Sequence, residues 1–101
     1  MVMRMDAANA DAVAAAFAEH DQTSLPREIG ANSRTLFRFH DLYMHLIEAD
    51  TDIMGNLYRA RAHPDFQKTN ARLSELLAPY SPNWSELKDS KAEVFYHRSW
   101  K

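Results

Sequence analysis

The sequence predicts an α+β domain in which helices cover one face of a four-stranded antiparallel sheet. Two observations favour this fold class. Strand-like alternation of side chains defines a hairpin within residues 34–49. Apolar residues at helical spacing come before it, in residues 6–19, and after it, in residues 50–77. Because 101 residues suffice for one hydrophobic core, we expect a single domain over residues 1–101.

The N-terminal part predicts a short strand followed by a helix. Residues 1–5 are mostly apolar, Asp6 is a good N-cap, and an alanine-rich run continues to about Glu19. The stripe expected to face the core consists of Ala10, Val13, Ala14, Phe17 and His20. Its last member should therefore point inward at the end of the helix. Pro26 and Gly30 then interrupt the chain before the hairpin begins.

The hairpin turns at residues 40–41, and its tightest register pairs Phe39 with Leu42, Phe37 with Met44, Leu36 with His45, and Arg34 with Ile47. Opposed residues share a face of the sheet. One face, here called the apolar face, consists of Thr35, Phe37, Phe39, Leu42, Met44 and Leu46. The other, here called the mixed face, consists of Arg34, Leu36, Arg38, Tyr43, His45 and Ile47.

Two helices and a last strand are expected after the hairpin. Asp50 or Thr51 should cap a helix whose buried side consists of Ile53, Met54, Leu57 and Tyr58. A further helix should open at Pro64, with a stripe made of Phe66, Thr69, Leu73, Leu76 and Leu77. Residues 92–100 have strand-like composition. The order β-α-β-β-α-α-β is that of the ferredoxin-like fold.

A sheet covered by helices on one side leaves its other side open. The apolar face carries more large side chains than a soluble monomer usually exposes. We therefore expect a homodimer in which two apolar faces meet, with the mixed face turned toward the helices.

Composition excludes several functional classes. There are no cysteines, so disulfides and thiolate metal sites are excluded, and the histidines lack metal-ligand spacing, so no metal is expected. The net charge of −2 with interspersed signs disfavours a nucleic-acid partner. No apolar run approaches the roughly 20 residues that span a membrane, and no signal peptide is evident, so we expect a soluble, cytoplasmic protein.

Three ionisable side chains should converge if the mixed face meets the helices: Arg34 and His45 from the hairpin, and His20 from the first helix. A histidine that titrates near neutrality can accept a proton, and a guanidinium can stabilise an enolate oxygen. Structural roles compete with this interpretation. His20 can complement the helix dipole, His45 can be a satisfied core residue, Arg34 can be a surface charge, and Asp21 can be a turn former.

Three long runs carry a family resemblance: AAFAEHD (residues 15–21), LFRFHDLYMHLIEAD (36–50) and ELKDSKAEVFY (86–96). They resemble the aromatic polyketide cyclases of the tetracenomycin type, over almost the whole chain. The resemblance implies a ferredoxin-like protein of the dimeric α/β-barrel type. It also implies a lyase of antibiotic biosynthesis, which closes a ring in an aromatic polyketide by an aldol-type condensation with loss of water, using no cofactor. The family's proposed active-site residues fall on His20, Asp21, Arg34 and His45.

For this reaction we expect a substrate cavity between sheet and helices, walled by Phe17, Leu36, Tyr43, Ile47 and Tyr58. One of the two histidines would remove a proton between two carbonyls, and Arg34 would stabilise the enolate. The other histidine, oriented by Asp21, would protonate the departing oxygen. A cofactorless monooxygenase that forms quinones and a non-catalytic polyketide-binding chaperone are the alternatives.

Overall fold

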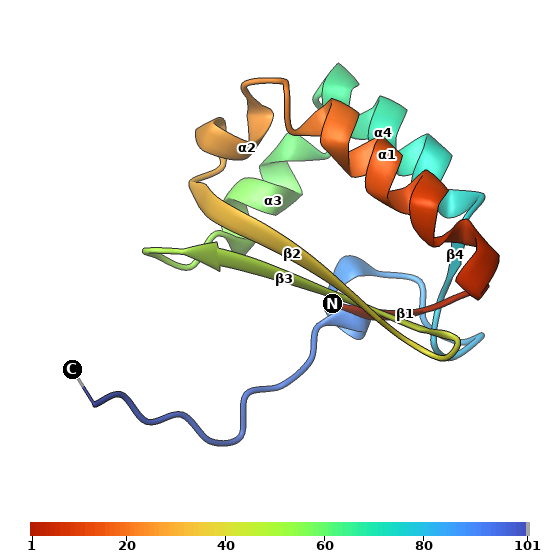
Figure 1. The fold of residues 1–101 in the computed structure, drawn as a ribbon. Coiled ribbons are helices and arrows are strands. Elements are labelled where there is room, and N and C mark those ends of the chain that lie inside the picture. Colours follow the sequence, from red (N-terminus) through yellow and green to blue (C-terminus); the bar gives the residue numbers. More distant parts are fainter. Residues whose placement is uncertain (101) are drawn as a thin grey trace.

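The computed structural model describes residues 1–100, apart from the side chain of Leu87, and has the predicted α+β architecture (Figure 1). The strands are β1 (Val2–Met5), β2 (Ala31–Phe39), β3 (Leu42–Ala49) and β4 (Leu77–Ala78). The helices are α1 (Ala10–His20), α2 (Leu25–Glu28), α3 (Met54–Ala60) and α4 (Pro64–Ser74). All strand pairs are antiparallel, and the sheet order β2-β3-β1-β4 confirms the ferredoxin-like class. Among residues 1–100, each helix is too short or too polar to cross a membrane.

The hairpin has the predicted register, with Leu36 opposite His45 and Arg34 opposite Ile47. His40 adopts a left-handed conformation at the turn, with φ of 54°. The mixed face points toward the helices, where Tyr43 is 2% exposed. The apolar face lies on the side without helices, where Phe37 is 47% exposed (Figure 1). The two-sided interpretation of this hairpin is therefore confirmed.

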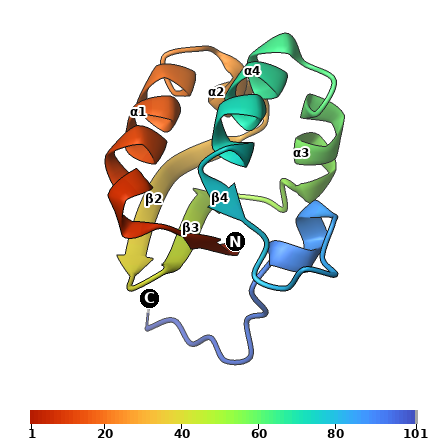
Figure 2. The same ribbon diagram turned by 90° about the vertical axis from the view of Figure 1, so that its right-hand side faces the viewer.

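Helix α1 packs on the sheet beside α4 (Figure 2). Asp6 caps a 3₁₀ turn at Ala7–Asn9 that leads into α1, as its side chain accepts from the backbone of Ala8. The buried residues of α1 are Val13, Ala16, Phe17 and His20. Ala14 is exposed rather than buried, because it lies one residue, about 100° of helix rotation, beyond Val13. At the surface, Glu19 binds Lys68 and Arg72 of α4.

Two local features differ from the sequence interpretation. The segment expected to be only a breaker contains the short helix α2, because Pro26 lies in its first turn, where a proline needs no hydrogen-bond partner. The N-cap position of α3 is Ile53 and not Asp50 or Thr51, and the carboxylate of the preceding Asp52 accepts from the backbone of Met54.

The fourth strand is at Leu77–Ala78 and not at residues 92–100, so this part of the prediction was wrong. Helix α4 ends at Ser74, and the chain then pairs with the edge of β1, with Ala78 opposite Arg4. This pairing occupies the edge that the last strand would have needed. Residues 91–100 extend away from the sheet without regular structure, and Phe95 is 95% exposed (Figure 1).

Candidate active site

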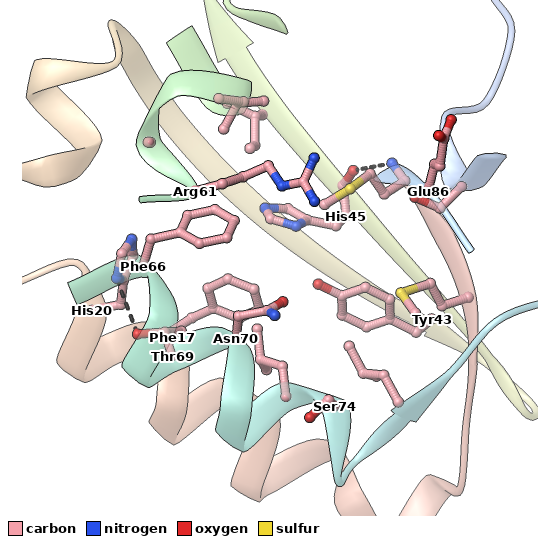
Figure 3. A pocket seen from close by; sticks show the side chains of 18 of the residues that line it. Phe17, His20, Tyr43, His45, Arg61, Phe66, Thr69, Asn70, Ser74 and Glu86 are labelled. Atoms are coloured by element: carbon pink, nitrogen blue, oxygen red, sulfur yellow. Dashed lines mark hydrogen bonds between the residues drawn. The ribbon is translucent and has the colours of Figure 1, made fainter. Parts of the chain in front are cut away.

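A cavity of about 440 Å³ lies between the mixed face of the hairpin and the helices (Figure 3). The hairpin contributes Arg34, Tyr43, His45 and Ile47 to its lining. Helix α1 contributes Phe17 and His20, α3 contributes Leu57 and Ala60, and α4 contributes Phe66, Thr69, Asn70, Leu73 and Ser74. The three residues whose convergence the sequence predicted, His20, Arg34 and His45, therefore all line one cavity.

Arg34 is the most tightly held side chain of the site. Its Nε lies 3.1 Å from both carboxylate oxygens of Asp21, and its Nη2 lies 2.8 Å from Oδ1. The guanidinium also lies 4.4 Å from the centre of the Phe17 ring. Asp21 follows α1 directly, so the end of this helix fixes an arginine of the facing strand. Such paired charge-assisted bonds hold the planar guanidinium in one orientation.

His45 lies at the centre of the cavity wall and is 6% exposed. Its Nε2 is 2.9 Å from Nη1 of Arg34, and its ring meets Phe17 edge to face with the centres 5.0 Å apart. Its backbone is paired with Met1, which places the ring at a fixed point of β3. Burial, followed by the charges of Arg34 and the N-terminus, lowers the pKa of His45 to about 3. The ring is therefore neutral at physiological pH.

His20 is the last residue of α1 and is 7% exposed. Its Nδ1 lies 3.1 Å from the hydroxyl oxygen of Thr69 on α4 (Figure 3). Burial and then Arg34 lower the pKa of His20, while Asp21 and Asp65 oppose this effect. His20 is therefore a neutral imidazole near pH 7. Unlike His45, it has carboxylates nearby that stabilise its protonated form.

The remaining expected residues divide between the cavity and other parts of the fold. Phe17, Tyr43 and Ile47 line the cavity, whereas Leu36 and Tyr58 do not. Leu36 packs into the core cluster around Val13. Tyr58 is 38% exposed, because it lies one residue, about 100° of helix rotation, beyond Leu57, and Arg61 lies over its ring. Asp21 holds Arg34 and not a histidine, so its orienting role differs from the one expected.

Sequence reasoning missed several polar groups of the lining. Asn70 and Ser74 on α4, Arg61 after α3, and Glu86 beyond β4 all lie at the cavity (Figure 3). Thr69 belonged to the predicted buried stripe of α4, and as the polar member of that stripe it could have been identified. No predicted apolar stripe includes Asn70, Ser74, Arg61 or Glu86, so the sequence carries no comparable signal for them.

The site combines a neutral histidine, a fixed guanidinium and walls that are largely apolar. Burial also raises the pKa of the Tyr43 hydroxyl, so this group stays protonated and can donate a hydrogen bond. A neutral imidazole can accept a proton from carbon, and a guanidinium in a poorly hydrated cavity can stabilise the resulting oxyanion. The arrangement suits proton abstraction next to a carbonyl in an apolar substrate.

Comparison with known proteins places this site in a family. The polyketide synthesis cyclase family model matches residues 1–101. Tetracenomycin F2 cyclase of Streptomyces glaucescens is 68% identical over 100 residues, which cover 99% of this chain and 90% of that protein. An uncharacterised protein of Streptomyces coelicolor is 40% identical, covering 95% of this chain and 88% of its own length.

A solved structure agrees with the sequence matches. The structure of the Streptomyces glaucescens tetracenomycin F2 cyclase, described as a type-II polyketide cyclase, superposes with a TM-score of 0.93 and 67% identity. The superposition covers 98% of this chain and 93% of that one. This chain therefore belongs to the polyketide synthesis cyclase family.

Proposed function

We propose that this chain is an aromatic polyketide cyclase, which closes a ring in a multicyclic polyketide by intramolecular aldol-type condensation with loss of water. The observation that carries this proposal is the guanidinium of Arg34, held by Asp21 and His45 at the wall of an apolar cavity of about 440 Å³. A cavity of this size accommodates a flat molecule of several rings. The similarity to a protein named tetracenomycin F2 cyclase supports the same assignment.

In the proposed mechanism His20 is the base. It removes an acidic C–H proton that lies between two carbonyls, and Arg34 stabilises the enolate oxygen. The enolate carbon attacks a second carbonyl of the same molecule, and the new alkoxide takes the proton back from His20. His20 then takes a neighbouring C–H proton and delivers it to the new hydroxyl, which leaves as water, and the double bond formed makes the new ring aromatic. His45 is a poorer base than His20, because its Nε2 already accepts a hydrogen bond from Arg34.

Positioning supplies a large part of the rate in this mechanism. Protons between two carbonyls are already acidic, and aromatisation drives the reaction forward. The apolar walls, which include Phe17, Ile47 and Leu73, would hold the two reacting carbons together and exclude water. We therefore expect that loss of one ionisable group lowers turnover without abolishing it.

Anaerobic incubation with a polyketide intermediate that still lacks its last ring tests the proposal. Ring-closed, dehydrated product in excess over protein, formed without oxygen, is the expected result. Product that forms only with oxygen would indicate a quinone-forming monooxygenase instead. Product limited to the amount of protein would indicate a chaperone that binds the polyketide without turnover.

We further propose that the protein is a homodimer joined through the apolar faces. In the single chain Phe37 is 47% exposed, Phe39 60% and Leu46 47%, all on the side of the sheet without helices. Residues 91–100 extend on this same side and expose Phe95 and Tyr96 (Figure 1). A second copy would cover these side chains, which together exceed the apolar patch of a typical monomer.

A further inference from the structure

The two ring nitrogens of His45 have different environments. Nε2 lies 2.9 Å from Nη1 of Arg34. A guanidinium can only donate hydrogen bonds, so Nε2 must be the acceptor and must carry a lone pair. A neutral imidazole has one N–H, and in His45 that N–H is therefore on Nδ1. The position of Arg34, which Asp21 fixes, thus determines the tautomer of His45.

The Nδ1–H of His45 has no hydrogen-bond partner among residues 1–100, although the atom is fully buried. Buried donors without a partner are costly and uncommon in folded proteins. His45 as a whole is only 6% exposed, and its ring projects into the cavity from β3 (Figure 3). Because Nδ1 itself has almost no accessible surface, an acceptor atom of a molecule bound in the cavity reaches this donor only if the ring turns slightly when the molecule binds.

We propose that Arg34 locks His45 in the Nδ1–H tautomer, and that this N–H donates a hydrogen bond to a carbonyl or enolate oxygen of the bound polyketide. His45 is then an oxyanion donor and not the base. Arg34 has a second function as the positioning residue that sets this donor, besides its own charge. The identity of the oxygen rests on the proposed function, whereas the tautomer itself does not.

The three polar residues of the site then have separate tasks. His20, supported by Thr69, is the group left to exchange protons with carbon and oxygen. His45 and Arg34 present an N–H and a guanidinium, which form a preorganised oxyanion site on the mixed face. This division requires a ligand with an acceptor oxygen close to the His45 ring, as a hydroxylated polycyclic ketone has.

Nitrogen-15 NMR of the histidine rings in the full-length protein tests the tautomer directly. At neutral pH we expect the Nδ1 of His45 to be the protonated nitrogen and Nε2 the unprotonated one, with the signals assigned by their loss in His45→Asn. In Arg34→Met the lone pair loses its donor, and the ring should shift toward the Nε2–H form. A protonated Nε2 in the unmodified protein, or an unchanged spectrum in Arg34→Met, would overturn the proposal.

A pair of isosteric variants tests the donor role. The side-chain amide of asparagine reaches the position of Nδ1, whereas that of glutamine reaches the position of Nε2. We expect His45→Asn to keep kcat within about tenfold and His45→Gln to lose about hundredfold, with smaller changes in KM. His40→Asn is the matched control, since His40 lies at the exposed hairpin turn in a conformation that asparagine tolerates.

A binding measurement separates this inference from the proposed reaction. The probe is 1,8-dihydroxyanthraquinone, a planar polycycle with ketone and phenol oxygens, titrated by fluorescence. It should bind His45→Asn about as well as the unmodified protein and His45→Gln about tenfold more weakly. Equal affinity for the two variants would refute the donor role even if the cyclisation assay succeeds. Failure of the cyclisation assay would refute the reaction and leave the tautomer and binding results as independent evidence.

Discussion

The two faces of the hairpin differ in burial and in what their side chains contact, although they alternate along the same two strands. On the mixed face Tyr43 and His45 are 2% and 6% exposed, and His45 bonds a guanidinium that is fixed from α1. On the apolar face Phe37 and Leu46 are each 47% exposed and have no helix above them. Because side chains alternate between the faces of a strand, the same two strands carry the candidate active site on one face and the proposed dimer contact on the other.

The largest expected effect comes from charging the apolar face. Phe37→Glu combined with Leu46→Glu would bury carboxylates without partners at the proposed dimer contact, so the dissociation constant should rise by about a thousandfold. Sedimentation at micromolar concentration measures the shift from dimer to monomer. Arg38→Glu, a charge reversal at the exposed end of the mixed face, should leave the dimer intact. A stable monomer of the unmodified protein would contradict the proposed assembly.

Filling the cavity should have the next largest effect, on turnover. Ile47→Trp places a large ring into the lining opposite Arg34 and should lower turnover about a hundredfold or divert the product, because the reacting carbons are displaced. Leu46→Trp makes the same change one residue earlier, on the apolar face, and should retain turnover. Product analysis distinguishes the two. Equal turnover in both variants would show that the cavity is not where the substrate is held.

The register and the two faces of the hairpin between Arg34 and Ile47 were predictable from sequence, because a two-residue turn leaves one register. The start of β2 at Ala31, with an irregular pairing between Ala31 and Ser33, was not predicted. The placement of His20 was predictable from the spacing of Val13 and Phe17 on α1. The fourth strand was not, since residues 92–100 have strand composition but the free edge of β1 is occupied by Leu77 and Ala78. Strand composition alone does not determine where a pairing partner exists.

The candidate site was predictable in its members more than in its connections. His20, Arg34 and His45 converge as expected, but the partner of Asp21 depends on the distance between the end of α1 and β2, which no sequence pattern reports. Leu36 and Tyr58 carry suitable side chains but pack elsewhere, because the cavity occupies only part of the mixed face and one side of α3.

Acid should destabilise the protein through the mixed face, which is the smallest of these effects. The pKa of His45 is about 3 in the folded protein and near its ordinary 6.5 in the unfolded chain. Between these two pH values the unfolded chain binds a proton that the folded chain does not. The free energy of unfolding should fall by up to about 1.4 kcal/mol per pH unit from this residue as pH drops below its ordinary pKa, and stay level above it.

Urea unfolding between about pH 5 and 7 measures this slope. The pKa of His20 is also lowered, so it contributes with the same sign. His45→Asn removes one of the two groups and should give a shallower slope than the unmodified protein. An unchanged slope in this variant would show that His45 is not held neutral by the fold.

The proposed role of Arg34 in ring closure can be tested directly against Arg4, a second arginine that has similar partners but is more exposed. Arg34 and Arg4 each bind a carboxylate, Asp21 and Asp41, and each lies 4.4 Å from an aromatic ring, but only Arg34 lines the cavity. The measurement is anaerobic turnover of Arg34→Met beside Arg4→Met. We predict a loss of about a hundredfold for the first, with the fold retained, and little change for the second. Full turnover in Arg34→Met, or an equal loss in both, would contradict the account.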